Sequence, residues 1–280
     1  MLKLFFLLTF FVFTLNANVL RVGYSTNSFN ELSKKDSQIV LNLWFEDMMK
    51  SLNHSAKFTF YDDITLMAED FDSNKLDLIF ANGMELVKYF NISKMQGAFT
   101  GGAVGKNADN LVEVRRKSTS KEFLKRQKIL RISLLKGETP SQVYAKSIVL
   151  REYKNRETLY IHTKKNSAAL LKLFFNQSDI AIVPKKTFEF AIELNPQIGI
   201  KLEVMHQTNI TLATLGYFNK NTDVSFRDKV TELAFKVVQK KRGKQMLLMF
   251  KTPKLMKVNP EQLIPIRKLY KEYLKLERGI

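Results

Sequence analysis

Short apolar segments alternate with longer amphipathic segments along the first third of the chain. Apolar runs of strand length are followed by stretches in which apolar residues recur at helical spacing. The stretch that we expect to begin at Asp36 places Val40, Leu43, Trp44 and Met48 on one helical face. Such β-α-β alternation predicts a parallel sheet covered by helices. The predicted strands are 20–24, 57–61 and 76–81, and the predicted helices after the first are 64–71 and 83–90.

The alternation stops at a glycine-rich stretch and then restarts, which predicts a second α/β unit. Four glycines lie between residues 97 and 105, a composition that fits a crossover between domains. In each half an aspartate, Asp77 or Asp179, begins an apolar strand that lies between two amphipathic segments. The architecture therefore repeats, although the sequence does not. The predicted strands of the second unit are 111–114, 129–134, 158–162, 179–183 and 201–205, and its helices are 140–152, 167–175 and 186–194.

The last part of the chain is expected to return to the first unit. A strand at 211–218 precedes a helix for which Ser225 is the predicted N-cap, with Asp228 completing a capping box. The tail at 260–276 has an amphipathic pattern, and we expect its apolar face to pack in the core rather than in a partner's groove. We therefore predict two lobes, one formed by residues 18–105 and 211–280 and the other by residues 106–210.

The N-terminus has the layout of a secretory signal peptide. Lys3 precedes an apolar run that ends near the small residue Ala17. The run is short for a membrane span, which needs about 20 residues, although an uncleaved anchor is the alternative. We expect residues 1–17 to be removed and the mature protein to be exported to the periplasm.

The absence of cysteine agrees with a freely diffusing exported protein. The chain contains no cysteine, so it forms no disulfide and carries no lipid-attachment site of that kind. We expect a monomer in a bacterial periplasm.

The charge balance favours anionic partners. Lysine and arginine total 45 against 27 acidic residues, which gives a formal net charge of +18. The basic clusters are short and far apart, however, and no nucleic-acid motif accompanies them. We therefore expect a solvated basic surface and no nucleic-acid partner. A non-specific polyanion binder remains an alternative, and it predicts binding that weakens steeply with salt.

The sequence lacks the usual patterns of catalytic chemistry. The three histidines, His54, His162 and His206, are scattered, and no HExxH, P-loop or GxSxG pattern is present. Zinc sites normally combine cysteine and histidine at short spacings. We predict that the protein is not an enzyme and that it has no metal and no cofactor.

Four segments follow one another in an order typical of a known family. They are the strand at 20–24, the strand at 77–80, the helix start at 137–141 and the strand at 179–184. In this order they resemble the phosphate/phosphonate-binding group of type II periplasmic binding proteins, which serve ABC transporters. The resemblance covers about residues 18–250. It implies two lobes, each a mainly parallel sheet flanked by helices, a two-strand hinge and a ligand bound between the lobes.

The resemblance also implies that the loops at 24–26, 81–83 and 137–141 bind the ligand. Open parallel sheets bind ligands at such loops, beyond the carboxyl ends of their strands. Free backbone N–H groups at a helix N-terminus favour an anion. Pro140 removes one such donor, and Glu138 would repel a phosphate, which leaves an amine-bearing ligand open. Ordinary helix capping is the alternative role for Thr139 and Ser141. The predicted ligand-binding residues are Tyr24, Ser25, Thr26, Asn82, Gly83, Glu138, Thr139 and Ser141.

Some further residues are weaker candidates. Lys185 and His206 follow strands of the second lobe, and each has an ordinary surface role as its alternative. The aromatic residues Tyr24, Phe29 and Tyr144 would line the cleft or pack in the core.

These observations predict a periplasmic solute-binding protein. It would capture a small, phosphate- or phosphonate-like anion and deliver it to the membrane permease of an ABC transporter. The alternative is a ligand-sensing partner of a membrane receptor kinase. Both uses require the same closure of two lobes, so the sequence does not choose between them.

Overall fold

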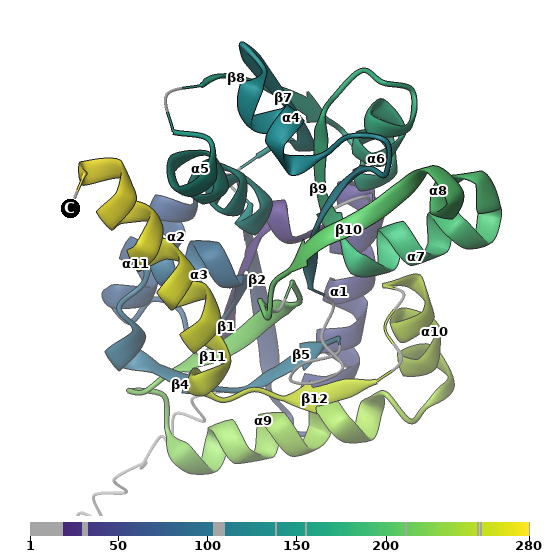
Figure 1. Cartoon of the computed structure of the whole chain (residues 1–280). Coiled ribbons are helices and arrows are strands. Elements are labelled where there is room, and N and C mark those ends of the chain that lie inside the picture. The colour runs from purple at the N-terminus through teal and green to yellow at the C-terminus, as the bar shows by residue number, and fades with distance from the viewer. Residues whose placement is uncertain are drawn as a thin grey trace, which may run out of the picture.

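Two five-stranded sheets organise the chain into two lobes (Figure 1). The computed structural model describes residues 19–29, 33–102, 110–137, 139–154, 156–210, 212–250, 252 and 254–279. The predicted signal peptide lies outside these residues. None of the helices in the described ranges is long and apolar enough to cross a membrane.

The sheet of lobe 1 has the order β2-β1-β3-β11-β4. β1 is parallel to both β2 and β3, whereas β11 is antiparallel to its neighbours β3 and β4. The return strand therefore joins the first sheet, as predicted. The strands are β1 (Val19–Ser25), β2 (Ser55–Tyr61), β3 (Leu78–Asn82), β4 (Met95–Gly97) and β11 (Thr214–Asn219).

The sheet of lobe 2 repeats this arrangement in the order β10-β6-β9-β7-β8. β7 is parallel to β8 and β9, and β6 is antiparallel to β9 and β10. β7 thus corresponds to β1, and β6 takes the place of the antiparallel β11. The strands are β6 (Leu111–Arg116), β7 (Ile129–Leu135), β8 (Glu157–Thr163), β9 (Ile180–Pro184) and β10 (Leu202–Gln207).

Helices cover both faces of each sheet because the central strands are buried on both sides. In β3, Leu78 and Phe80 join one core, whereas Ile79 and Ala81 join the other, as the two-residue period of a strand requires. The helices of lobe 1 are α1 (Lys34–Lys50), α2 (Ile64–Asp72), α3 (Gly83–Tyr89), α9 (Val224–Val237) and α10 (Lys241–Met249). Those of lobe 2 are α4 (Lys121–Arg126), α5 (Pro140–Glu152), α6 (Asn166–Phe174), α7 (Lys185–Leu194) and α8 (Pro196–Lys201).

Matching arginine–aspartate pairs close the amino-terminal edge of both sheets. The Asp77 carboxylate accepts hydrogen bonds from the backbone and side chain of Arg21, at 2.6–2.9 Å. The Asp179 carboxylate accepts the same set from Arg131, at 2.8–3.1 Å. The two aspartates that the sequence places at the start of corresponding strands therefore have the same structural role in each lobe.

In the part of the chain that the structure describes, two connections lead from one sheet to the other, and they meet at one point. One leads from β5 (Phe99–Gly101) to β6 and the other from β10 to β11. A Cβ atom added to Gly102 would lie 3.1 Å from the Cβ of Ala213, so the two segments touch at this point. The predicted fold class, a two-lobed α/β protein with a two-strand hinge, is confirmed. β5 also pairs with β12 (Leu255–Lys257), and short 3-10 turns occur at Thr26–Phe29, Ile92–Lys94 and Pro260–Leu263.

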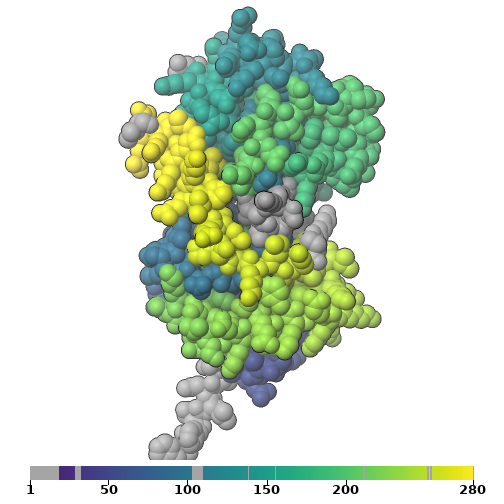
Figure 2. Space-filling view, turned by 60° about the horizontal axis from the view of Figure 1, so that its bottom comes forward, coloured from purple at the N-terminus to yellow at the C-terminus, as the bar shows by residue number. Residues whose placement is uncertain are grey.

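The C-terminal helix α11 (Ile264–Arg278) contacts both lobes (Figures 1 and 2). A Cβ atom added to Gly83 of α3, in lobe 1, would lie only 3.3 Å from the side chain of Ile266 of α11, so the two helices are in close contact. Glu272 accepts a hydrogen bond from Arg151 of α5, in lobe 2, at 2.9 Å. The expectation that all of residues 211–280 belong to lobe 1 thus leaves out the contact between α11 and lobe 2.

Two predicted helix starts differ from the structure. α1 begins at Lys34, and its N-cap is Ser33, so Asp36 lies in the first turn. Leu43, which was expected on the apolar face of this helix, is 51% exposed. α9 is capped by Asp223, whose carboxylate accepts from the Phe226 N–H at 2.8 Å. Ser225 was therefore the wrong cap. Serine and aspartate cap helices about equally well, so the backbone geometry decides which residue is used.

Candidate ligand-binding pocket between the lobes

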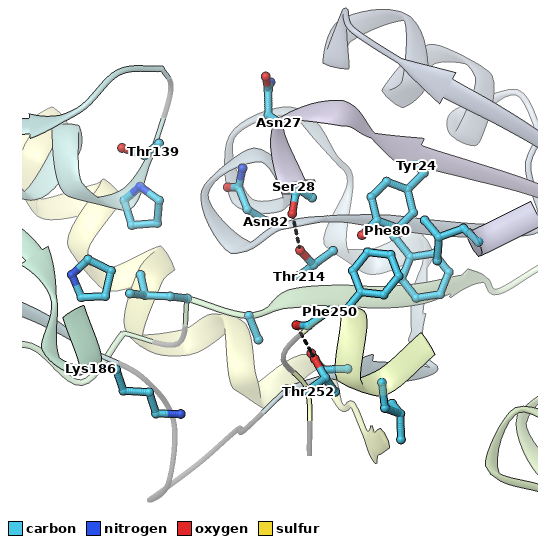
Figure 3. Close-up of a pocket in the computed structure, with 18 of the residues that line it drawn as sticks. Tyr24, Asn27, Ser28, Phe80, Asn82, Thr139, Lys186, Thr214, Phe250 and Thr252 are labelled. Carbon is cyan, nitrogen blue, oxygen red and sulfur yellow. Dashed lines mark hydrogen bonds between the residues drawn. The ribbon is translucent and has the colours of Figure 1, made fainter. Parts of the chain in front are cut away.

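A cavity of about 630 Å³ lies between the two lobes. Its lining includes the carboxyl ends of four parallel strands, at Tyr24, Asn82, Leu135 and Pro184. Figure 3 shows Thr139 and Lys186 on one side of the cavity and Tyr24, Ser28 and Phe80 on the other. The pocket therefore occupies the place where open parallel sheets bind ligands.

Three helices of lobe 2 begin at this pocket without a side-chain cap. The N-cap residues of α5, α6 and α7 are Thr139, Lys165 and Pro184, and all three line the cavity. The other two helices of lobe 2 are capped by the side chains of Ser120 and Asn195. The first backbone N–H groups of a helix have no partner within the helix, so these three N-termini direct positive dipole ends toward the cavity. The first N–H of α7, from Lys185, donates to the Asn110 carbonyl oxygen at 2.7 Å, and Pro140 at the start of α5 has none, so the donors are the N–H groups that follow.

Thr139 combines a position at the pocket with a side-chain hydroxyl that makes no hydrogen bond within the described residues. Thr139 holds the predicted N-cap position of α5, with Pro140 in the first turn, but its side chain makes no cap hydrogen bond. Its Oγ1 atom is buried and has no hydrogen-bond partner among the described residues. Ordinary capping, the alternative for Thr139, is therefore not what this side chain does. Ser141 also lines the pocket and is 5% exposed.

The charge of the described lining is positive. Lys165 and Lys186 contribute two cationic side chains from lobe 2, and no aspartate or glutamate belongs to the described lining. Together with the three helix N-termini, these lysines make the lobe 2 side of the pocket favourable for an anion.

Aromatic side chains form the lobe 1 side. The ring of Phe80 stacks 5.7 Å from that of Tyr24 and lies 5.5 Å from that of Phe99. The Trp44 ring meets Phe45 at 4.6 Å and Phe99 at 5.9 Å. We refer to Tyr24, Trp44, Phe45, Phe80 and Phe99 as the aromatic wall. All five line the cavity.

The hydroxyl of Tyr24 is hydrogen-bonded to a residue at the start of β11. It is hydrogen-bonded to the side chain of Thr214, and the Thr214 hydroxyl also donates to the carbonyl oxygen of Ser28 at 3.4 Å. Burial raises the pKa of the Tyr24 phenol far above its usual value. Tyr24 is therefore neutral at physiological pH.

Asn82 caps α3 at the edge of the pocket. Its Oδ1 atom accepts from the backbone N–H groups of Met84 and Glu85, each at 3.0 Å. The Glu85 carboxylate in turn accepts from the Asn82 N–H at 3.2 Å. This capping box fixes the Asn82 side chain where β3 ends.

Three predicted residues lie outside the described lining. Ser25 is fully buried and donates to the Glu85 carboxylate at 2.8 Å. The Thr26 hydroxyl donates to Asp62 at 2.5 Å. Gly83 packs against α11 through Ile266. Glu138 lies outside the described residues.

The structure thus brings Tyr24, Asn82, Thr139 and Ser141 together, and their part in ligand binding stays a prediction. The weaker candidates do not line the cavity: Lys185 pairs with Glu189 at 3.6 Å, and His206 stacks on the buried Tyr144 at 6.3 Å. The side chain of Phe29 lies outside the described residues. The sequence analysis missed Ser28, Lys165, Lys186, Thr214 and Phe250 as lining residues.

Comparisons with known proteins identify the same group. The model of a family described as "ABC transporter, phosphonate, periplasmic substrate-binding protein" matches residues 32–263. A search of curated proteins found no match.

Several solved structures share the fold. XAC2383 from Xanthomonas citri bound to ATP is 10% identical, over 94% of this chain and 99% of that one, with a TM-score of 0.66. PhnD1 from Prochlorococcus marinus in complex with methylphosphonate is 16% identical, over 93% and 100%, with a TM-score of 0.62. A binding protein component of an ABC phosphonate transporter from Pseudomonas aeruginosa is 17% identical, over 94% and 89%, with a TM-score of 0.58.

The family match spans most of the chain, and the fold and the inter-lobe pocket agree with it. The chain belongs to the phosphonate periplasmic substrate-binding proteins of ABC transporters.

Proposed function

We propose that this protein captures a small, phosphonate-like oxyanion between its lobes and delivers it to the membrane permease of an ABC transporter. One observation carries the proposal: three helix N-termini without side-chain caps meet two lysines on one wall of the inter-lobe pocket. The family consists of substrate-binding proteins, which are not enzymes.

The binding chemistry follows from this wall. Oxyanion oxygens would accept hydrogen bonds from the N-terminal N–H groups of α5, α6 and α7 and from the hydroxyls of Thr139 and Ser141. Lys165 and Lys186 would compensate the charge. Because these groups lie on lobe 2 and the aromatic wall lies on lobe 1, a bound ligand contacts both lobes and favours the closed form.

The hinge supplies the movement. Within the described residues, the two connections between the lobes meet at Gly102 and Ala213. Small residues there leave room for the backbone rotation that a hinge needs. Export would place the protein in the periplasm after removal of residues 1–17.

The first test is isothermal titration calorimetry of the mature protein with methylphosphonate and with inorganic phosphate. We expect saturable binding that persists at high salt. Thr139→Val keeps the side-chain shape and removes the hydroxyl, so it should weaken binding about five- to twentyfold. Thr158→Val, on β8 and outside the described lining, is the matched control.

Binding that ignores ligand structure and disappears with salt would support the polyanion binder instead. Uptake of radiolabelled ligand by cells that lack the gene tests delivery, and we expect uptake to be lost. If uptake persists while a transcriptional response to the ligand disappears, the sensor alternative replaces the transporter.

A further inference from the structure

The pocket is larger and less polar than a simple oxyanion requires. Its volume of about 630 Å³ lies within the range of about 300–1,000 Å³ that is typical of pockets for drug-sized ligands. An ion such as methylphosphonate would occupy only the lobe 2 end. The remainder is bounded by apolar side chains, namely Leu41, Trp44, Phe45, Phe80, Phe99, Met246, Leu247, Phe250 and Leu255.

These apolar side chains belong to a packed core and still border the cavity. Phe45 and Phe99 are at most 1% exposed, and both lie in the core cluster that joins β1 and β3 to α1, α9 and α10. These two rings therefore back the wall, and its accessible surface comes from neighbours such as Tyr24, Trp44 and Phe80, which are 6–7% exposed. Water at an apolar wall finds few hydrogen-bond partners, and an apolar group that displaces such water gains affinity.

Two buried donors in this part of the pocket have no partner. Ser28 and Trp44 are each 6% exposed and both line the cavity. Among the described residues, neither the Ser28 hydroxyl nor the Trp44 indole N–H makes a hydrogen bond. A buried polar group without a partner costs free energy, and a ligand that carries an acceptor would remove that cost.

The cationic and the aromatic parts are also separated in space, although lobe 1 contributes uncharged polar side chains as well, namely Asn27, Ser28, Asn82, Thr214 and Thr252. The lysines and the three helix N-termini come from lobe 2. The aromatic wall and the apolar residues Met246, Leu247, Phe250 and Leu255 come from lobe 1. Figure 3 shows Phe80 and Phe250 across the cavity from Thr139 and Lys186. A ligand that spans this cavity is charged at one end and apolar at the other.

We infer that the ligand is an oxyanion with a bulky aromatic substituent, such as an aryl phosphonate or an aryl phosphate ester. The inference rests on the proposed function and specifies its substrate class. The oxyanion lies against lobe 2, and the ring lies on the aromatic wall, where offset or edge-to-face contacts with Tyr24, Trp44 and Phe80 favour it over an alkyl chain. Where the ring carries an acceptor, a small shift of the wall would bring the buried Ser28 hydroxyl or Trp44 N–H to it; phenylphosphonate, which has no such acceptor, tests the ring alone.

Calorimetric titration with methylphosphonate, phenylphosphonate, octylphosphonate and the neutral compound benzyl alcohol tests the inference. We expect phenylphosphonate to bind at least about tenfold more tightly than methylphosphonate, because its ring buries apolar surface, and more tightly than octylphosphonate. Benzyl alcohol should not bind measurably, because it lacks the charged group.

A pair of variants ties the effect to the lobe 1 wall. Phe250 is partly exposed and lines the cavity, so Phe250→Ala removes a contact without emptying the core. It should weaken phenylphosphonate binding about three- to tenfold and leave methylphosphonate binding within about twofold. Phe175→Ala, at a residue of lobe 2 that is 64% exposed, should change neither. Thermal unfolding of each variant verifies folding.

The outcomes separate the inference from the proposed function. If methylphosphonate binds as tightly as phenylphosphonate, the aromatic substituent is refuted and the oxyanion binder stands. Tighter binding of octylphosphonate refutes the aromatic class in favour of an alkyl chain. If none of the probes binds, or if benzyl alcohol binds as well as phenylphosphonate, the proposed function fails and the inference fails with it.

Discussion

Two buried carboxylates of lobe 2 have pKa values that are shifted in opposite directions. Burial would raise the pKa of Asp179, but its hydrogen bonds with Arg131 outweigh burial, and the pKa lies below the usual value. Burial and the nearby Glu152 raise the pKa of Glu113 to about 7, although Lys121, Arg151 and Arg115 lower it in part. Glu113 is 3% exposed. Burial thus sets the direction of the pKa shift unless hydrogen-bonded partners outweigh it, as Arg131 does at Asp179.

We expect Glu113→Gln to stabilise the protein above pH 7. The pKa of Glu113 is higher in the folded state than the usual ~4.3. Wild-type stability therefore falls as the pH rises from ~4.3 to about 7, because the unfolded chain releases its proton first. The variant should gain about 1–3 kcal/mol at pH 8 and little at pH 4. Urea unfolding at both pH values measures this, and an equal gain at both would contradict it.

We expect Asp179→Asn to destabilise the protein by about 1–3 kcal/mol at pH 6, because Arg131 loses its charged acceptor. The folded-state pKa of Asp179 is lowered, so the carboxylate contributes fully above the unfolded pKa of ~3.9. The contribution disappears as the pH falls through the folded value. The difference from wild type in urea unfolding should therefore shrink near pH 2. Asp228→Asn, at an exposed position, is the control.

At the scale of elements, α5 and α11 connect the pocket to the outer contact between the lobes. The N-cap of α5, Thr139, lies in the pocket. Near the other end of this helix, Arg151 is hydrogen-bonded to Glu272 of α11. α11 in turn packs against α3, which begins beside Asn82. A movement of lobe 2 therefore has to be accommodated at the contact between α5 and α11.

We expect Leu269→Ala to destabilise the protein by about 2–4 kcal/mol through loss of buried apolar contacts. Leu269 lies on α11, is 8% exposed and belongs to the core cluster that includes residues of both lobes. Chemical denaturation measures the loss. Leu248→Ala, in α10 at a residue that is 76% exposed, should change stability by less than about 0.5 kcal/mol. Equal effects of the two variants would show that α11 is not part of the core.

At the scale of the molecule, two lobes with matching sheets are joined by two crossing segments and face each other across one pocket. The lobe 2 wall carries the lysines, whereas the lobe 1 wall combines aromatic rings with uncharged polar side chains. Neither wall alone encloses a ligand, so binding and closure are coupled.

We expect ligand binding to make the molecule more compact. Small-angle X-ray scattering of the mature protein should show a smaller radius of gyration when the binding phosphonate is added at saturation, because closure brings the lobes together. Thr139→Val at the same ligand concentration should show a smaller change. An unchanged radius with wild-type protein at proven saturation would indicate that binding does not close the hinge.

The sequence by itself determined the fold class and most strands of the two sheets, but not the short elements such as α4, α8 and β12. Strands such as 76–81 and 179–183 are short apolar runs between amphipathic segments, and that pattern depends on local periodicity alone. The matching positions of Asp77 and Asp179 marked the repeat. The helix start at Thr139 was also recognisable, because Pro140 and its neighbours carry a local signal.

Only the tertiary structure decided which residues share the pocket. In the sequence, Trp44 has the pattern of a core residue of α1. No local pattern marks Phe250, Thr214 or Lys186 as a neighbour of Thr139 in the pocket. These side chains meet because the hinge brings together the strand ends of two lobes. Unused hydrogen-bonding groups, such as the Thr139 hydroxyl and the Trp44 N–H, are likewise visible only once every neighbour is placed. Local periodicity specifies elements, whereas a site between lobes depends on contacts between residues that are far apart in the chain.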